Sequence, residues 1–388
     1  MKSNLTVINI SGPDHPGITA RLMQCLENHQ VKLYDIGQNV TYELLSLSFV
    51  IKVIPGSNVL KDLLFEATEM GMKMDYKEVE RLGKAPHTES YIISCVSPEI
   101  IPPTFMKEIA SLLARHEINI KRMDSLQPKA FHSVDFQVDV LTDKCDIDQV
   151  KQGLLALSHT HSLDLAMIKD NVWRRNKRLI VFDMDSTLIQ SEVIVEMAKS
   201  HGVGDKVHDI TERAMNGEIN FDQSLKERVA LLKGLPVSDL ESILKNIKLT
   251  EGVEHFLSTV QKLGYKTAII SGGFLFFANH FKNLLLIDYA FANDLEIHEG
   301  KLTGKIKGDI VNANQKAVLL EMLAKQENLN LEQVVAIGDG ANDLPMLAKA
   351  GLGIAFYAKE IVKKEASQHM SYGNMASILQ FLGIPPEV

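Results

Sequence analysis

Two aspartates stand one residue apart at the end of an apolar run, in the segment Leu179-Ile-Val-Phe-Asp-Met-Asp-Ser-Thr-Leu188. A buried strand here would deliver Asp183 and Asp185 to its carboxyl end, the edge at which open α/β sheets bind ligands. Two carboxylates this close favour a nearby cation, and oxygen ligands favour a hard ion such as Mg²⁺. The other interpretation is a turn whose Asp and Ser side chains make local hydrogen bonds before a helix around Glu192.

Polar groups follow two more predicted strands and begin one predicted helix. These segments are Ala268-Ile-Ile-Ser-Gly-Gly273, Val334-Val-Ala-Ile-Gly-Asp-Gly-Ala-Asn-Asp-Leu344, and the helical run 315–324. The hydroxyl of Ser271 and the bare backbone N–H groups of Gly272 and Gly273 can hold phosphate oxygens. Asp339 could complete the cation site that the first two aspartates begin.

Each of these segments also has an ordinary structural interpretation. Ser-Gly is common in turns, a lysine such as Lys316 near a helix start is usually solvated, and Asn342 or Asp343 could cap the next helix. However, the predicted strand ends would bring carboxylates, a hydroxyl and an ammonium group to one edge of one sheet. This convergence favours the functional interpretation.

The four segments resemble, in order and spacing, the four motifs of the haloacid dehalogenase superfamily, and most closely those of its phosphoserine phosphatase family. The matching residues are Asp183-Met-Asp-Ser-Thr, Ser271-Gly-Gly, Lys316 and Gly338-Asp-Gly-Ala-Asn-Asp343. The resemblance covers residues 179–388. It implies Mg²⁺-dependent hydrolysis of O-phosphoserine to serine and phosphate through an aspartyl-phosphate, the last step of serine biosynthesis.

The resemblance also implies roles for individual residues. Asp183 is the implied nucleophile, and Asp185 is the implied acid and base. The implied Mg²⁺ ligands are Asp183, the backbone carbonyl of Asp185, and Asp339, with Asp343 close by. The implied substrate contacts at the sheet edge are Ser271, Gly272, Lys316 and Asn342. Further contacts are implied in a helical cap over residues 191–248. There Glu192 would bind an ammonium group, Arg228 a carboxylate, and Met215 with Phe221 would form an apolar wall. A solvated helix face is the alternative for Glu192 and Arg228.

From residue 178 onward, continuous apolar strands alternate with helices, the pattern of a parallel sheet that is covered on both faces. The predicted strands are 179–182, 266–270, 334–337 and 352–355. The long, mostly helical stretch between the first two strands is too long for a simple crossover and predicts the inserted cap. We therefore expect an α/β domain over 178–388, with a doubly wound parallel sheet.

The preceding 170 residues predict the element order β-α-β-β-α-β twice, which is two ferredoxin-like units at 1–82 and 88–170. A polar stretch at 83–88 separates the units. The predicted strands are 5–10, 31–40, 45–54 and 72–79, then 91–96, 118–126, 133–141 and 163–168; the predicted helices are 17–28, 58–69, 103–116 and 147–157.

This repeat, with the turn Gly12-Pro-Asp-His-Pro-Gly17, resembles tandem ACT domains. The resemblance implies an amino-acid effector, with serine as the obvious candidate, and a homodimer. The second unit has Ser97-Pro-Glu-Ile-Ile-Pro-Pro103 in place of the glycine-bearing turn, so no ligand role is implied for that copy. A dimerisation platform without a ligand remains the alternative.

Charge and composition exclude several other classes. Forty-one basic and 49 acidic residues give a net charge of −8, which disfavours nucleic acid and anionic membranes as partners. We see no apolar run long enough for a membrane span and no signal peptide, and we expect a cytoplasmic protein. The three cysteines show no Cys-x-x-Cys spacing and are expected to be reduced.

Other catalytic motifs are missing from the chain. No cysteine is followed by the Cys-x5-Arg pattern of cysteine phosphatases, and there is no P-loop, Gly-x-Ser-x-Gly elbow or His-Glu-x-x-His motif. One hypothesis without catalysis remains, an amino-acid-sensing protein with a vestigial catalytic half. It would predict a lost motif carboxylate, and none is lost.

Overall fold

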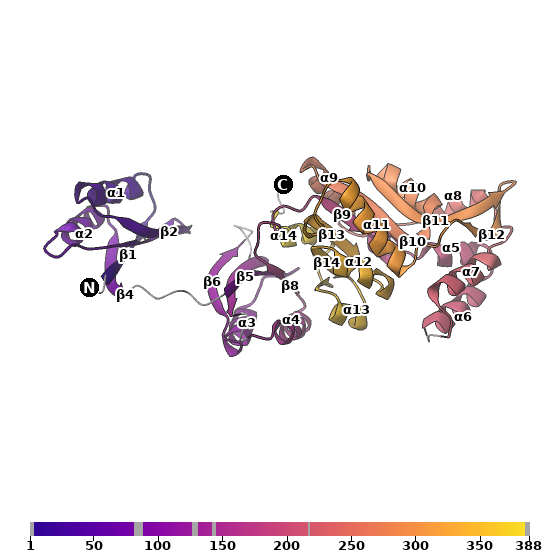
Figure 1. The fold of residues 1–388 in the computed structure, drawn as a ribbon, viewed down its shortest axis with the longest axis horizontal. Helices are drawn as coiled ribbons and strands as arrows, with labels where there is room; N and C mark the ends of the chain where they lie inside the picture. The colour runs from indigo at the N-terminus through magenta and orange to yellow at the C-terminus, as the bar shows by residue number, and fades with distance from the viewer. Residues whose placement is uncertain (1–3, 81–87, 126–130, 142–144, 216–217, 385–388) are drawn as a thin grey trace. The chain divides into compact units, whose positions relative to one another are not determined.

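The computed structural model describes residues 4–80, 88–125, 131–141, 145–215 and 218–384, in an α/β architecture (Figure 1). The chain divides into two compact units, Met1–Pro86 and His87–Val388, each of which is described by itself below. Within the described ranges, no helix is both long enough and apolar enough to cross a membrane.

The first unit is an antiparallel sheet in the order β2-β3-β1-β4 with two helices, as the predicted β-α-β-β-α-β order requires. Its elements are β1 (Asn4–Pro13), α1 (Ile18–Asn28), β2 (Leu33–Thr41), β3 (Leu44–Ile51), α2 (Val59–Glu69) and β4 (Lys73–Glu80). Side chains along β3 alternate between exposed and buried, and Leu47 and Phe49 are among those that pack in the core.

The second unit begins with the same element order and the equivalent sheet order, β6-β7-β5-β8. The elements are β5 (Thr88–Val96), α3 (Pro103–Arg115), β6 (Asn119–Ser125), β7 (Ser133–Leu141), α4 (Ile147–His161) and β8 (Asp164–Lys169). The predicted strand that ended at Leu126 extends into residues outside those described. Both predicted ferredoxin-like folds are therefore present.

A larger sheet follows, in the order β12-β11-β10-β9-β13-β14-β15. Its strands are β9 (Leu179–Phe182), β10 (Lys266–Phe274), β11 (Tyr289–His298), β12 (Lys301–Lys307), β13 (Val334–Gly338), β14 (Leu352–Phe356) and β15 (Gln368–Met370). All pairings in this sheet are parallel except that of β11 with β12. The four predicted strands are confirmed, and the carboxyl ends of β9, β10 and β13 meet at one edge.

Helices surround this sheet and form the predicted insertion between β9 and β10 (Figure 1). The insertion, called the cap below, contains α5 (Val193–Ser200), α6 (Gly204–Met215), α7 (Phe221–Leu231) and α8 (Val237–Leu244). The remaining helices are α9 (Val253–Lys262), α10 (Leu275–Leu284), α11 (Ala313–Gln326), α12 (Leu344–Lys349), α13 (Glu360–Glu365) and α14 (Ile378–Phe381).

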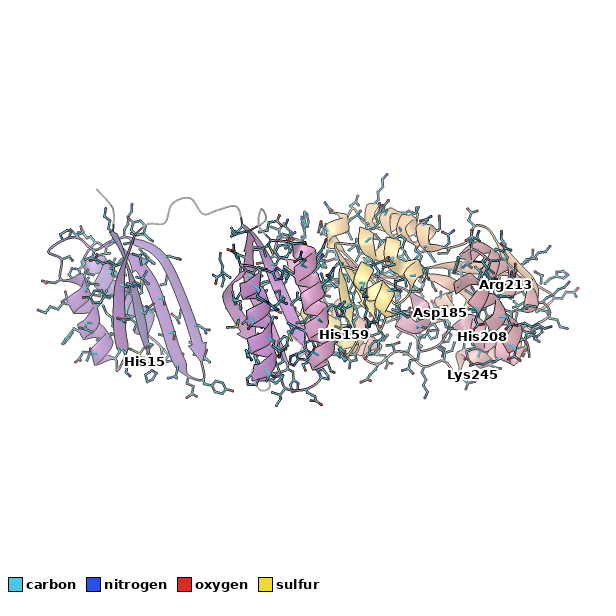
Figure 2. All side chains as sticks on the ribbon, turned by 90° about the horizontal axis from the view of Figure 1, so that it is seen from below. His15, His159, Asp185, His208, Arg213 and Lys245 are labelled. Carbon is cyan, nitrogen blue, oxygen red and sulfur yellow. The ribbon has the colours of Figure 1, made fainter. Side chains whose placement is uncertain are left out.

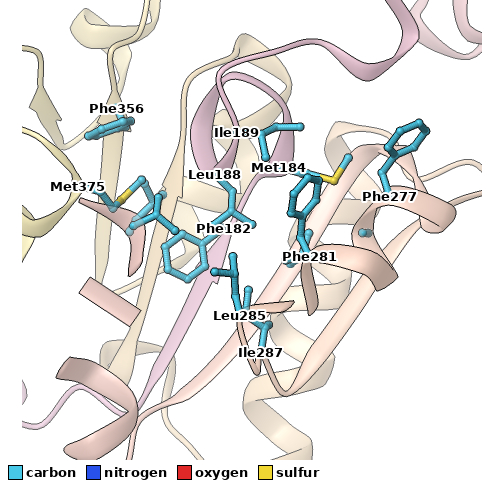
Figure 3. Close-up of a cluster of buried hydrophobic side chains, with 14 of the residues drawn as sticks. Phe182, Met184, Leu188, Ile189, Phe277, Phe281, Leu285, Ile287, Phe356 and Met375 are labelled. Atoms are coloured by element: carbon cyan, nitrogen blue, oxygen red, sulfur yellow. The ribbon is translucent and has the colours of Figure 1, made fainter. Parts of the chain in front are cut away.

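Apolar side chains pack on both faces of the large sheet, because β9 alternates between two core clusters. Phe182 lies in one cluster with Phe281 and with Met184 and Leu188, which belong to the turn that carries the two aspartates (Figure 3). Val181, on the other face, belongs to the second cluster. Packing on both sides therefore holds the end of β9 in place.

The second ferredoxin-like fold is joined to the large sheet through side chains at two sheet edges. Asp164 on β8 is fully buried and accepts backbone N–H bonds from Ser371 at 2.6 Å and Gly373 at 2.7 Å. The Gln368 amide on β15 bonds both the N–H (2.8 Å) and the carbonyl (2.7 Å) of Met167. These bonds pair backbone N–H and carbonyl groups at the edges of the two sheets, and the two parts form one compact unit.

Candidate active site

The turn after β9 presents both aspartates of the first motif. The backbone N–H of Asp183 bonds the Ile337 carbonyl on β13 at 2.8 Å, and its carboxylate accepts the Met184 N–H at 2.7 Å. Ser186 has φ 57°, a left-handed backbone conformation that is unusual for residues other than glycine. Its hydroxyl donates to Glu192 at 3.0 Å, so this strained turn also links the cap to the strand end.

Asp185 is half-buried beside the second motif. Its carboxylate accepts the Val193 N–H at 3.2 Å, and a Cβ on Gly273 would come within 2.6 Å of its Oδ2. Burial, together with the charges of Glu192 and Asp183, raises the pKa of Asp185 well above its ordinary value. A raised pKa favours the protonated form of a carboxyl, the form that acts as a general acid.

The second motif forms a buried loop at the end of β10. The Ser271 hydroxyl is buried and accepts the Gly273 N–H at 2.9 Å. Asn293 on β11 donates its amide to the carbonyls of Gly272 at 2.8 Å and Gly273 at 3.3 Å, and it accepts the Val311 N–H at 2.9 Å. Asn293 therefore holds the loop in shape, a role that we did not predict from the sequence.

Lys316 is not the solvated lysine that the structural alternative described. It lies in the first turn of α11 with no exposed surface, and its Nζ is 3.0 Å from Asp183 and 2.7 Å from Asp343. Burial works to lower the pKa of Lys316, but the two carboxylates outweigh it and raise that pKa above its ordinary value. A permanently charged ammonium group therefore touches the predicted nucleophile.

The fourth motif adds two more carboxylates. Asp339 accepts a hydrogen bond from Thr187 at 3.0 Å, and burial with the charges of Asp183 and Asp343 raises the pKa of Asp339 to about 7. Asp343 does not cap α12 with its side chain; it accepts the Gly340 N–H at 3.0 Å instead. The Asn342 side chain lies against Gly340 in the same turn.

Three of these carboxylates could hold a metal ion. One oxygen from each of Asp183, Asp339 and Asp343 lies within 4.8 Å of the others. The Lys316 ammonium group contacts two of these three carboxylates, those of Asp183 and Asp343, and an all-oxygen donor set fits Mg²⁺. The residues present therefore fit a Mg²⁺ ion. The carboxylate of Asp185 is not part of this group, and its predicted metal contact through the backbone carbonyl stays a prediction.

The cap closes over this edge (Figure 2 labels Asp185 beside the cap, where His208 and Arg213 mark α6). Arg228 on α7 is half-buried: burial lowers the pKa of its guanidinium, while the charges of Glu192 and Asp185 oppose that effect. Both acidic residues therefore act electrostatically on the Arg228 guanidinium. Phe221 also lies over Gly272, within 3.1 Å of where a Cβ would be. The Met215 side chain lies outside the described residues.

Family models match two parts of the chain. A model of haloacid dehalogenase-like hydrolases matches residues 177–351, and a model of the ACT domain matches residues 4–77. The first match contains the four motifs, and the second contains the first ferredoxin-like fold.

Curated relatives and solved structures match as well. A phosphoserine phosphatase of Archaeoglobus fulgidus is 48% identical over 66% of this chain and 74% of its own length. One of Streptomyces coelicolor is 34% identical over 98% of this chain and 92% of its own. A solved structure described as a phospho-aspartyl intermediate analogue of phosphoserine phosphatase is 47% identical, with a TM-score of 0.50. The match covers 53% of this chain and 99% of the chain in that structure.

Proposed function

Because the chain belongs to the phosphoserine phosphatases, a family of haloacid dehalogenase-like hydrolases, we propose that it hydrolyses O-phosphoserine to serine and phosphate with Mg²⁺, in serine biosynthesis. One observation carries the proposal. The Asp183 carboxylate lies 3.0 Å from the buried Lys316 ammonium, at the strand end where Asp185 is held with a raised pKa. The proposed nucleophile, a cation and the proposed proton donor thus lie close together.

The reaction runs in two displacements. A carboxylate oxygen of Asp183 attacks phosphorus, the bond to the serine oxygen breaks, and Asp185 gives its proton to that oxygen. Asp185 then takes a proton from water, the water oxygen attacks phosphorus, and the bond to Asp183 breaks. The solved relative with a phospho-aspartyl intermediate analogue supports this route.

Several groups would stabilise the transferred phosphoryl group. Its oxygens carry most of the charge, and Lys316, the Ser271 hydroxyl and the Gly272 N–H would bind them, with Asn342 at the rim. The ligands of Mg²⁺ would be Asp183, Asp339 and the Asp185 backbone carbonyl, with Asp343 beside them. When bound, the ion would offset the negative charge of the carboxylates and of the phosphate.

A phosphate-release screen tests this function. Phosphoserine, phosphothreonine and sugar phosphates are offered to the full chain with Mg²⁺ and again after chelation. We expect release from phosphoserine above all, and only with Mg²⁺. A chain that releases phosphate from none of them with Mg²⁺ would instead support the sensor without catalysis.

Substrate choice would come from the cap. Arg228 can grip a carboxylate through a bidentate contact, and Glu192 can meet an ammonium group, which are the two charges of an α-amino acid. The electrostatic effect of Glu192 and Asp185 on the Arg228 guanidinium supports this assignment.

The Arg228→Ala variant should lose far more activity on phosphoserine than on phosphoethanolamine, which lacks the carboxylate. A lost charged hydrogen bond is worth about 1.5–3 kcal/mol, or roughly tenfold to a hundredfold in kcat/KM. Steady-state kinetics on both substrates measures this difference. Arg213→Ala, which removes an exposed cap arginine paired with Glu227, is the matched control. Equal losses of kcat/KM on both substrates would contradict the assignment of Arg228 to the substrate carboxylate.

We also propose that the first ferredoxin-like fold binds serine in a homodimer of the chain. Gly17 begins α1 in a left-handed conformation (φ 100°) and offers no side-chain cap, which leaves helix N–H groups for a small carboxylate. The ACT-domain match supports an amino-acid ligand.

Calorimetric titration of serine into the full chain should therefore give heat, and Gly17→Ala should abolish it. Because any side chain is strained at Gly17, His15→Ala in the same turn is the second variant, expected to weaken binding. Light scattering, with and without serine, reports the oligomer. A dimer that takes up no amino acid would establish the platform alternative.

A further inference from the structure

One hydrogen bond joins the cap to the helix that carries Lys316. Asp222 lies in the first turn of α7, and Asn312 is the N-cap residue of α11. The Asn312 amide nitrogen donates to the two carboxylate oxygens of Asp222, at 3.1 and 3.4 Å. The amide oxygen of Asn312 accepts the Gln315 N–H at 3.1 Å. One side chain thus caps α11 and holds α7.

Both helices carry proposed substrate contacts. Lys316 follows Asn312 by one helical turn, and its N–H bonds the Asn312 carbonyl at 2.9 Å. Arg228 lies further along α7 from Asp222. The distance between the phosphate-binding ammonium and the carboxylate-binding guanidinium therefore depends on how these two helices meet.

The core side of this contact is already fixed. Asn293 holds the Val311 N–H, next to Asn312, and the same amide binds the carbonyl of Gly272. Phe221, next to Asp222, lies over Gly272. The Ser271-Gly272-Gly273 loop therefore contacts the start of α7 through Phe221 and is linked to the start of α11 through Asn293.

The far end of α7 is anchored in a different way. Backbone hydrogen bonds join the residues after it to β12, from Gly234 N–H to the Leu302 carbonyl at 2.8 Å and from Leu302 N–H to the Leu235 carbonyl at 2.9 Å. Such backbone pairing is strong in a helix-to-strand junction that is largely buried. Arg228 lies in the last turn of α7, close to this anchor, and the first turn is held by the side-chain hydrogen bond of Asp222, so the two contacts together fix the direction of the helix.

We propose that Asp222 and Asn312 are positioning residues for this reaction, which rests on the proposed function. Their hydrogen bond holds the start of α7 against the start of α11, and so sets Arg228 at the distance from Lys316 that fits one molecule of phosphoserine. The pair touches neither the phosphate nor the reacting atoms, and it acts through the two helices.

Three single variants separate this contact from helix capping. Asn312→Ser keeps a good N-cap but is too short to reach Asp222. Asn312→Asp keeps a cap and places two carboxylates against each other. Asp222→Ala leaves α11 capped by its own asparagine. The double variant Asp222→Asn/Asn312→Asp exchanges donor and acceptor, and so restores the bond with the cap kept.

We expect KM for phosphoserine to rise about tenfold in the single variants, the loss of one hydrogen bond to a charged group, and most in Asn312→Asp. The double variant should recover most of this loss. With p-nitrophenyl phosphate, which has no carboxylate or ammonium for the cap to hold, KM should change less. Asp239→Asn, which changes a half-buried acidic residue in the first turn of cap helix α8, is the matched control.

A measurement without substrate keeps the inference independent of catalysis. Hydrogen exchange at the first turn of α7 should be faster in each single variant and slow again in the double variant. Unchanged exchange, equal KM increases on both substrates, or failure of the double variant to recover would each overturn the proposal. If the wild type hydrolyses p-nitrophenyl phosphate but not phosphoserine, the proposed function fails, and the exchange data still decide whether this contact holds α7.

Discussion

The Asp183→Asn variant should release phosphate from phosphoserine about 10⁴-fold more slowly than the wild type, or slower still, as expected when a covalent nucleophile is removed. An amide has nearly the shape of the carboxylate, but its oxygen is a poor nucleophile. Continuous phosphate detection measures the rate, and Asp239→Asn in the cap is the control for a remote change of the same kind.

This loss should not come from unfolding. The charge of Asp183 raises the pKa of Asp185 and of Asp339, which means that the buried carboxylates repel one another. Removing one negative charge relieves that repulsion, while Lys316 keeps its contact with Asp343 at 2.7 Å. The melting temperature of the variant without added metal should therefore equal or exceed that of the wild type.

The covalent adduct itself can be sought. Wild-type chain quenched in acid during turnover of labelled phosphoserine should carry the label on Asp183, and hydroxylamine should remove it. Near-normal turnover in the variant, with no label on the wild type, would mean that water attacks phosphorus directly.

The strands that carry the motifs were predictable because their signal is local. Leu179–Phe182 is a continuous apolar run, and such a run followed by polar groups marks the ligand edge of a parallel sheet. The positions of Asp183, Ser271 and Asp339 at one edge follow from this rule alone. Their assignment to one reaction came from the resemblance to a family.

Asn293 could not be predicted in the same way. It lies in β11, a strand that the apolar pattern did not reveal, and its hydrogen bonds reach Gly272 and Gly273 on the neighbouring strand. Asparagine is a poor strand residue, so local propensity argues against its position. Only the tertiary contact explains it. The hydrogen bond between Asp222 and Asn312 is hidden for the same reason.

The second ferredoxin-like fold departs from its sequence pattern. Along β7 polar and apolar residues alternate, which predicts one face in water, yet Ser133 and Asp135 are buried. Arg174, from the segment before β9, pairs with Asp135 at 2.8 Å and is itself buried. The large sheet and its neighbouring segments cover this face. The pattern of residues within β7 cannot predict this burial, because the covering residues come from elsewhere in the chain.

The Lys316→Met variant should lower kcat about 10²- to 10³-fold, the usual loss when one group that stabilises charge in a transition state is removed. Methionine fills much of the same volume, but it supplies no positive charge. The carboxylates of Asp183 and Asp343 lose their buried partner, which should also cost about 3–5 kcal/mol of stability. Urea unfolding measures that cost, and kcat is measured on chain that remains folded.

A second buried lysine separates the two effects. Lys177 is 2% exposed, and its ammonium donates to the Glu332 carbonyl at 2.6 Å. Burial lowers the pKa of Lys177 to about 8, whereas the carboxylates raise that of Lys316, so the two lysines differ in what their charge does. Lys177→Met should lower stability less and leave kcat unchanged. If Lys316→Met were to lose stability while its folded chain kept a normal kcat, Lys316 would only balance the buried carboxylates, and the phosphoryl charge would have to be stabilised by other groups.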